Sequence, residues 1–252
     1  GASRRLKCIG NAENVWIHEP ATDLSPSCLM TGAQIPLALK PPRRPTFGNF
    51  IAGPNASLIE TLSSGLEPGQ WYFLAGPPGS GRSHLLSASF ADLIRSGNDA
   101  KFIALTAQPN WALLDKTDGD FVLVDDVDAL AGDSDGERLL FNALNRWRER
   151  RTAVVMSGAG RSGFALPDLA SRLGQAVRLT IKPLDETDLR KLLGRLSAEH
   201  EVALGRGAAD YLITRGPRSP ADLVRLFEQL VLRALSEQRT LSIPLIRAYL
   251  KD

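Results

Sequence analysis

Residues 71–86 read Trp71-Tyr72-Phe73-Leu74-Ala75-Gly76-Pro77-Pro78-Gly79-Ser80-Gly81-Arg82-Ser83-His84-Leu85-Leu86. The stretch begins with an apolar run of strand length, turns through a loop rich in glycine and proline, and enters an apolar helical pattern. The loop has the spacing G-x-x-x-x-G-R-S of a phosphate-binding P-loop, with Arg82 where lysine is usual. Glycines let backbone N–H groups turn inward around phosphate oxygens, and the following helix directs its positive end toward the same anion. We therefore predict a nucleotide phosphate site here.

The residues of this loop are expected to share the work of binding the nucleotide. Those predicted to contact it are Gly76, Pro77, Pro78, Gly79, Ser80, Gly81, Arg82, Ser83 and His84. The hydroxyl of Ser83 is expected to bind the Mg²⁺ that accompanies the nucleotide. An ordinary glycine-rich turn is the simpler alternative, but strand, loop and helix follow one another in the order that a phosphate site needs.

The composition of the chain is that of a globular protein. Its 252 residues are 43% hydrophobic and 23% charged, enough for one large domain or for a domain with a smaller one. A formal net charge of +2 argues against a strongly basic nucleic-acid coat. Cys8 and Cys28 make neither a disulfide framework nor a metal site, which fits a reducing cytosol. No apolar run approaches the roughly 20 residues of a membrane span, so we expect a cytoplasmic protein with no membrane partner.

Apolar runs alternate with helical patterns over residues 46–181. Strands are expected at 71–75, 101–106, 121–124, 152–156 and 177–181, with helices mainly at 55–64, 83–96 and 137–150. Because the runs are apolar throughout, they indicate a five-stranded parallel sheet covered by helices on both faces. Only helical patterns follow, at 185–200, 207–214, 219–237 and from 243 onward. We predict a tail (1–45), an α/β nucleotide-binding domain (46–181) and an all-α lid (182–252).

Two carboxylates follow the predicted third strand and complete the expected nucleotide site. Asp125 would hold the Mg²⁺ shell, directly or through water, and Asp126 would polarise the attacking water. The alternative is an acidic cap at the end of a strand, which the upstream loop makes less attractive. Ser157 follows the predicted fourth strand. Its hydroxyl either orients water near the γ-phosphate or belongs to a simple Ser-Gly turn.

An apolar hexapeptide, Gln34–Leu39, precedes the proline-rich linker Lys40–Pro45. Such a linker is stiff and extended. Apolar side chains are costly to leave in water. We therefore expect the hexapeptide to dock, either on its own domain or on a partner, and composition leaves both open.

Several motifs resemble those of the DnaA/Hda family of AAA+ proteins and together cover residues 34–252. They are Thr46-Phe47-Gly48-Asn49-Phe50, Gly79–Leu86, Val124–Gly132, Leu166-Pro167-Asp168-Leu169-Ala170-Ser171-Arg172-Leu173 and Arg239–Pro244. The block at 166–173 is the most specific of them. The resemblance implies an AAA+ fold with a helical lid, in which Phe47 and Phe50 border the adenine of ADP or ATP.

The resemblance also implies a function in chromosomal replication. Hda-type members bind the DNA-loaded sliding clamp through a short peptide, reach DNA only through that clamp, and promote ATP hydrolysis by the DnaA initiator to prevent re-initiation. The clamp-binding side chains would be Gln34, Ile35, Leu37 and Leu39. Arg172 would be an arginine finger that stabilises charge on the γ-phosphate in DnaA's site. The chain's own nucleotide, with Mg²⁺, would set the lid angle, with weak or no intrinsic hydrolysis, and a homo-oligomer is a further expectation.

Two positions depart from the pattern of this family or of P-loops generally. Arg82 is planar and delocalised, whereas the usual lysine is a compact point charge, although Hda-type members resemble this sequence in having arginine. The family places a nucleotide-sensing arginine early in a lid helix, where this sequence has Ala221. Arg218 and Arg225, one turn to either side, are the nearest substitutes.

Two other functions remain as alternatives. A helicase-loader ATPase would share the P-loop-His-Leu pattern, and intrinsic hydrolysis stimulated by single-stranded DNA would favour it. A DNA-binding module would use the densest basic cluster, which comprises Arg146, Arg148, Arg150 and Arg151. A solvated helix C-terminus is the simpler interpretation of that cluster, because the helix dipole favours cations there.

Overall fold

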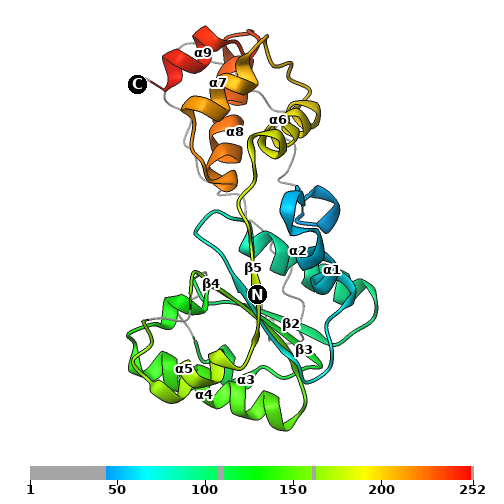
Figure 1. The fold of residues 1–252 in the computed structure, drawn as a ribbon, viewed down its shortest axis with the longest axis vertical. Coiled ribbons are helices and arrows are strands. Elements are labelled where there is room, and N and C mark those ends of the chain that lie inside the picture. Colours follow the sequence, from blue (N-terminus) through cyan, green and yellow to red (C-terminus); the bar gives the residue numbers. More distant parts are fainter. Residues whose placement is uncertain (1–43, 107–110, 161–162, 251–252) are drawn as a thin grey trace, which may run out of the picture. The chain divides into compact units, whose positions relative to one another are not determined.

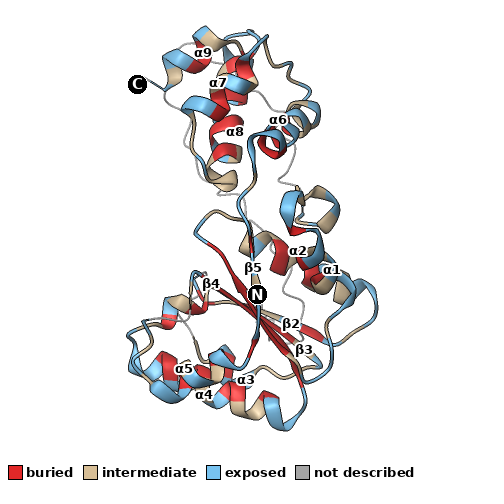
Figure 2. Cartoon of the chain, in the orientation of Figure 1, coloured by how far each residue is buried: buried red, intermediate tan, exposed pale blue. Residues whose placement is uncertain are grey.

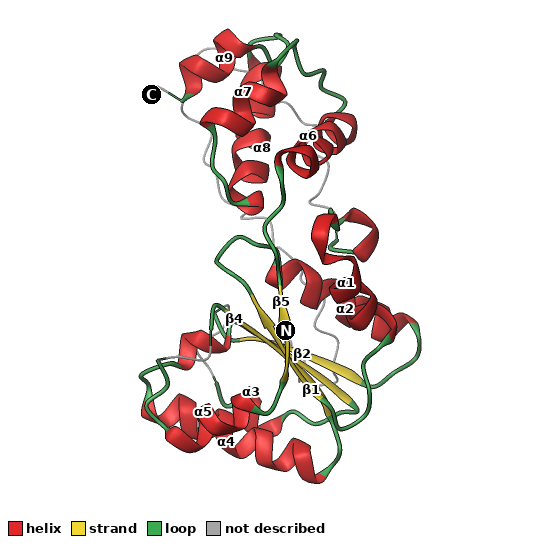
Figure 3. Ribbon diagram, viewed as in Figure 1, coloured by secondary structure: helices red, strands yellow, loops and turns green. Residues whose placement is uncertain are grey.

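The computed structural model describes residues 44–106, 111–160 and 163–250 of the chain. An α/β part comes first, and a purely helical part follows it, as Figure 3 shows. The peptide Gln34–Leu39, for which we predict clamp binding, lies outside the described residues. None of the described helices is long and apolar enough to cross a bilayer.

The α/β part is built on a five-stranded parallel sheet with the order β2-β3-β4-β1-β5 (Figure 1). Its strands are β1 (Trp71–Ala75), β2 (Ala100–Ala104), β3 (Phe121–Asp125), β4 (Ala153–Gly158) and β5 (Val177–Thr180). Its α-helices are α1 (Ala56–Ser64), α2 (Arg82–Arg95), α3 (Leu113–Lys116), α4 (Ser134–Glu149) and α5 (Pro167–Gly174). Three short 3-10 helices accompany them, η1 (Phe47–Asn49), η2 (Gly53–Asn55) and η3 (Val127–Leu130).

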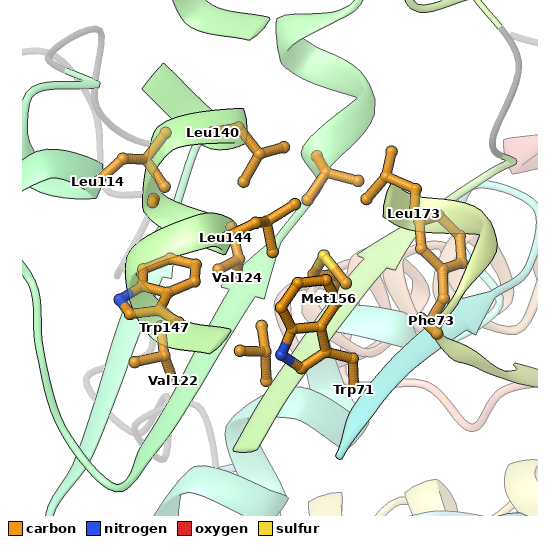
Figure 4. Packing of buried hydrophobic residues seen from close by; sticks show 14 of the residues in the cluster. Trp71, Phe73, Leu114, Val122, Val124, Leu140, Leu144, Trp147, Met156 and Leu173 are labelled. Carbon is orange, nitrogen blue, oxygen red and sulfur yellow. The ribbon is translucent and has the colours of Figure 1, made fainter. Parts of the chain in front are cut away.

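Helices cover both faces of this sheet, as the apolar strands predict. Because successive side chains of a strand point to opposite faces, Trp71 and Phe73 of β1 pack with Leu144 of α4 and Leu173 of α5 (Figure 4). The intervening residue Tyr72 lies on the other face, in a cluster with residues of α1 and α2. The central strands are buried (Figure 2), whereas the edge strands β2 and β5 are partly exposed.

The helical part forms a core of its own. It contains α6 (Glu186–His200), α7 (Ala208–Arg215), α8 (Pro220–Ser236) and α9 (Ile243–Tyr249). Fully buried side chains from all four helices meet in it, among them Leu193, Leu212, Phe227 and Ile246. Helix α8 begins as the sequence predicts, with Ser219 as N-cap and Pro220 in the first turn.

A buried asparagine ties the end of the sheet to the start of the helical part. Asn55 is 2% exposed, and its side-chain amide donates to the carbonyl of Lys182 at 3.0 Å. The side-chain oxygen accepts from the N–H of the same residue at 2.7 Å. The side-chain amide of Asn55 thus satisfies both backbone groups of Lys182, as a neighbouring strand would.

Two local predictions need correction, and four short elements were not predicted. Ser157 does not follow the fourth strand but lies inside β4, because the pairing with β1 continues to Gly158. Helix α4 begins three residues earlier than predicted, since the Asp133 side chain accepts from the N–H of Gly136 at 2.7 Å and caps the helix there. The short elements η1, η2, η3 and α3 have no periodic pattern that would have predicted them.

Candidate functional site

The loop from Gly76 to Ser83 connects the end of β1 to the start of α2, and its glycines are sterically required. Gly79 and Gly81 have φ values of 75° and 99°, in the left-handed region that side chains disfavour. A Cβ on Gly81 would also lie 2.7 Å from a ring carbon of Phe50, and one on Gly79 would lie 2.0 Å from Ser219 Oγ. The backbone can therefore curl as a phosphate-binding loop only with glycine at both positions.

Arg82 is fixed at three points at the base of this loop. One guanidinium nitrogen donates to the carbonyl of Gly76 at 2.9 Å, and the other donates to Asp126 Oδ1 at 2.7 Å. A second carboxylate, that of Asp128, lies 3.7 Å away. Only 11% of the Arg82 side chain is exposed, so this charge-assisted bond is shielded from water. Arg82 thus joins the start of the P-loop to the residues that follow β3.

The two carboxylates at the end of β3, of which Asp125 is the last strand residue, have different partners. Asp125 is buried and accepts from the Ser157 hydroxyl at 2.5 Å, while the same hydroxyl accepts from the N–H of Asp126 at 2.9 Å. Burial, together with the negative charges of Asp125 and Asp128, raises the pKa of Asp126, and Arg82 opposes that rise. Ser157 is therefore committed to orienting both aspartates, and its expected role with water stays a prediction.

The side chains expected to hold Mg²⁺ suit that ion. Ser83 is exposed, and its hydroxyl has no hydrogen bond to the described part of the chain. Mg²⁺ prefers oxygen ligands and keeps several of its waters, so a hydroxyl and the nearby carboxylate of Asp125 fit an ion that a nucleotide brings. No group of three or more His, Cys, Asp or Glu residues among those described would hold a metal by itself.

The aromatic motif lies against the start of α2. The ring centroid of Phe50 is 5.5 Å from that of His84, and His84 Nε2 lies 3.0 Å from the carbonyl of Thr46. Burial lowers the pKa of His84, so its imidazole is neutral at pH 7. Arg195 of α6 donates to the carbonyl of Gly48 in the same segment. Phe47 also packs against the cluster on this face of the sheet, so the structure brings the predicted adenine-side residues together.

At the predicted sensor position, the backbone rather than a side chain meets the P-loop. The N–H of Ala221 donates to the carbonyl of Gly79 at 3.1 Å, and the Ser219 hydroxyl donates to the same oxygen at 3.3 Å. Arg225 is exposed and paired with Asp222 at 3.1 Å. Arg218 is also exposed and has no partner among the residues described. Neither arginine contacts the loop in this structure.

Arg172 lies in the last turn of α5. Its neighbours Leu169 and Leu173 are fully buried in the core beneath the helix, while Arg172 itself is partly exposed. Its guanidinium makes no hydrogen bond or ion pair with any residue that the structure describes. The predicted arginine finger is thus a cation without a described partner, on a helix whose buried leucines pack in the core.

Glu137 is a site residue that the sequence analysis missed. It is 1% exposed, and its carboxylate accepts from the backbone N–H groups of Gly132 (2.8 Å), Ala165 (2.9 Å) and Leu166 (2.7 Å). Burial disfavours its charge, but these three bonds outweigh burial and lower its pKa. A glutamate in the first turn of a helix is ordinary, so no sequence signal distinguishes it.

Two of the four arginines in the basic cluster near the end of α4 are paired with carboxylates. Arg146 is 3.0 Å from Asp118, which Arg150 also approaches at 2.7 Å. Arg148 donates to Gln175 and lies over the ring of Trp71, 4.5 Å from its centroid. Arg148 and Arg151 have no carboxylate partner among the described residues, so the DNA-binding alternative stays open.

A prediction about stability follows from the lowered pKa of Glu137. A carboxylate whose folded pKa lies below its unfolded value of 4.5 contributes stability above that pH, and the contribution is lost as the pH falls through the folded pKa. Glu137→Gln should therefore lower the free energy of unfolding at pH 7 by about 2 kcal/mol or more. The difference from wild type should shrink below about pH 4.5, as measured by urea unfolding at several pH values.

Asp135→Asn is the matched control, because Asp135 is an exposed carboxylate in the same helical turn. It should change the free energy of unfolding by less than about 0.5 kcal/mol at pH 7. Equal effects of the two substitutions would mean that helix-dipole charge, and not the buried hydrogen bonds, accounts for the contribution of Glu137.

Comparison with known proteins finds similarity in the lid sequence and in the fold. A family model described as the lid domain of Hda matches residues 185–250. Domain III of the Thermotoga maritima replication initiation protein DnaA superposes with a TM-score of 0.70, at 19% identity over 82% of this chain and 95% of that chain. AMPPCP-bound DnaA from Aquifex aeolicus superposes with a TM-score of 0.63, at 21% identity over 80% of this chain and 69% of that chain.

A third structure, the Thermotoga maritima RuvB Holliday junction branch migration motor, gives a TM-score of 0.60, at 16% identity over 78% of this chain and 68% of that chain. At these identities the likeness concerns the fold, and it confirms the predicted AAA+ architecture. The lid match is confined to residues 185–250, where the sequence is similar to the lid domain of Hda.

Proposed function

We propose that this chain is a nucleotide-bound regulator of replication initiation that promotes ATP hydrolysis in DnaA by supplying Arg172. The lid match and the DnaA-like fold support the assignment to replication initiation. The sliding clamp, contacted through Gln34–Leu39, would hold the regulator at DNA. Such a protein acts in the cytoplasm, on the nucleoid.

The observation that carries this proposal is the contrast between two arginines. Arg82, in the chain's own P-loop, is engaged by Asp126, the carboxylate expected to polarise water. Arg172 is held on a well-anchored helix but has no partner among the described side chains. A guanidinium that is presented and unpaired suits stabilisation of a partner's γ-phosphate, whereas the chain's own site is arranged to hold a nucleotide with little turnover.

The nucleotide would be ADP or ATP. DnaA structures of the same fold contain AMPPCP, and the loop Gly76–Ser83 has the backbone of a phosphate site. Ser83 and Asp125 are the side chains that would hold an accompanying Mg²⁺, which would neutralise phosphate charge. The phosphates would meet the N-terminus of α2, and Phe50 and His84 would lie on the base side.

Nucleotide binding is tested by Gly81→Ala. The new Cβ would lie 2.7 Å from Phe50 at a φ of 99°, so the loop must distort, and affinity for ADP should fall at least about 10-fold in calorimetry. Gly97→Ala is the matched control, because Gly97 has a φ of 80° but no atom within 4 Å of the added carbon. Both variants carry similar backbone strain, so equal ADP affinities would argue against a nucleotide site at Gly76–Ser83.

The finger role is tested by Arg172→Ala, assayed as stimulation of DnaA's ATPase in the presence of clamp-loaded DNA. Loss of an arginine finger costs about 10³–10⁵ in rate, so stimulation should disappear while ADP affinity stays unchanged. Arg178→Ala on β5, another exposed arginine nearby, serves as control and should stimulate normally. Full stimulation by the Arg172 variant would remove it from this role.

Tethering to the clamp is tested by deleting Gln34–Leu39. The deletion should abolish capture of the chain by immobilised clamp, because the apolar anchors would be gone, and should leave the circular dichroism spectrum and ADP affinity unchanged. Deletion of residues 20–25, also in the tail, is the control for shortening. Capture that survives loss of the hexapeptide would place the clamp contact elsewhere.

A further inference from the structure

The helix that carries Arg172 is held at its beginning by a side chain from another helix. Helix α5 has eight residues, and its N-cap, Leu166, has no side-chain acceptor for the free N–H groups of the first turn. Glu137 of α4 instead binds the entering backbone, at the N–H groups of Ala165 and Leu166. One buried carboxylate therefore fixes the direction in which the chain enters α5.

The same carboxylate also holds the segment that follows the nucleotide-site aspartates. Its Oε1 accepts from the N–H of Gly132, two residues after the end of η3. Helices α4 and α5 pack against each other, and Leu140 and Leu173 belong to the same buried cluster (Figure 4). Glu137 thus joins the loop after Asp126 to the entry of α5 within one packed unit.

The position of Arg172 depends on the backbone of α5, because no described side chain holds its guanidinium. Arg172 is the sixth residue of the helix, about 8 Å along the axis from Pro167 at 1.5 Å per residue. A tilt of about 8° at the beginning of α5 would therefore move Arg172 by about 1 Å. A misplacement of that size can cost about 100-fold in the rate of a catalysed step.

We propose that Glu137 is the positioning residue for Arg172, and that its three backbone hydrogen bonds set the finger in the geometry needed for hydrolysis in the partner. This inference rests on the proposed function of Arg172. Glu137 itself is buried and touches no nucleotide; it acts through the placement of α5.

The test compares Glu137→Gln with Asp135→Asn in the full chain, as stimulation of DnaA's ATPase against regulator concentration. Glutamine keeps the size of the side chain, but its NH₂ group faces backbone N–H donors and cannot accept from them. The plateau rate should fall about 10- to 100-fold, with the half-saturating concentration unchanged. Asp135→Asn, which removes the same charge from the same turn, should retain the wild-type plateau.

This division between plateau and half-saturation separates positioning from loss of folded protein. If Glu137→Gln only reduced the folded fraction, the half-saturating concentration would rise and the plateau would be reached at higher concentration. ADP affinity and clamp capture should also match wild type. A normal plateau for the Glu137→Gln variant would overturn the inference.

Two further measurements test the route through α5. Amide hydrogen exchange at Gly132, Ala165 and Leu166 should be faster in Glu137→Gln, and unchanged exchange there would overturn the inference. The double variant Glu137→Gln/Arg172→Ala should be no worse than Arg172→Ala alone, because both substitutions disable one group. An additional loss in the double variant would mean that Glu137 acts independently of Arg172.

The outcomes also separate this inference from the proposed function. If Arg172→Ala abolishes stimulation while Glu137→Gln retains it, the finger stands and the positioning role fails. If Arg172→Ala stimulates normally, the proposed function of the finger fails, and the positioning role fails with it.

Discussion

The pairing of β1 with strands on both sides is the constraint on which the rest of this structure depends. β1 runs parallel to β4 and to β5, and β4 continues the sheet to β3. In a parallel sheet every strand ends at the same edge, so the segments that follow the strands converge there. The P-loop after β1 and Asp125–Asp126 at the end of β3 meet because of this topology. The N–H of Gly76 even donates to the carbonyl of Gly158, at the end of β4 (3.2 Å).

Because these segments converge at one edge, several carboxylates lie close together there, and each has a specific hydrogen-bond partner. A buried carboxylate is unfavourable unless it is paired or hydrogen-bonded. The hydroxyl of Ser157 satisfies Asp125, and the guanidinium of Arg82 satisfies Asp126. Backbone N–H groups satisfy Glu137. The charges of the site largely compensate one another, whereas Arg172, like Arg218, has no partner among the described residues.

The lid meets the P-loop through backbone and hydroxyl groups and not through a charged side chain. The N–H of Ala221 at the start of α8 donates to the carbonyl of Gly79, and the Ser219 hydroxyl donates to the same oxygen. A backbone N–H carries little charge, and its hydrogen bond to Gly79 forms only when the loop has the right shape. On the proposed function, the bound nucleotide would therefore act through the geometry of the P-loop and lid. Such a role agrees with the expectation that the chain's own nucleotide sets the angle of the lid and is hydrolysed weakly or not at all.

The sequence by itself determined the parallel α/β sheet, the helical part that follows it and the extent of the main elements, because these depend on local periodicity. It also indicated Asp125, Asp126 and Arg172 through short contiguous motifs. It could not determine the pairing of Arg82 with Asp126, which are 44 residues apart, or the commitment of Ser157 to both aspartates. It gave no indication of Glu137, whose three partners are backbone N–H groups. Backbone donors carry no residue type, so only the tertiary structure decides which side chain they bind.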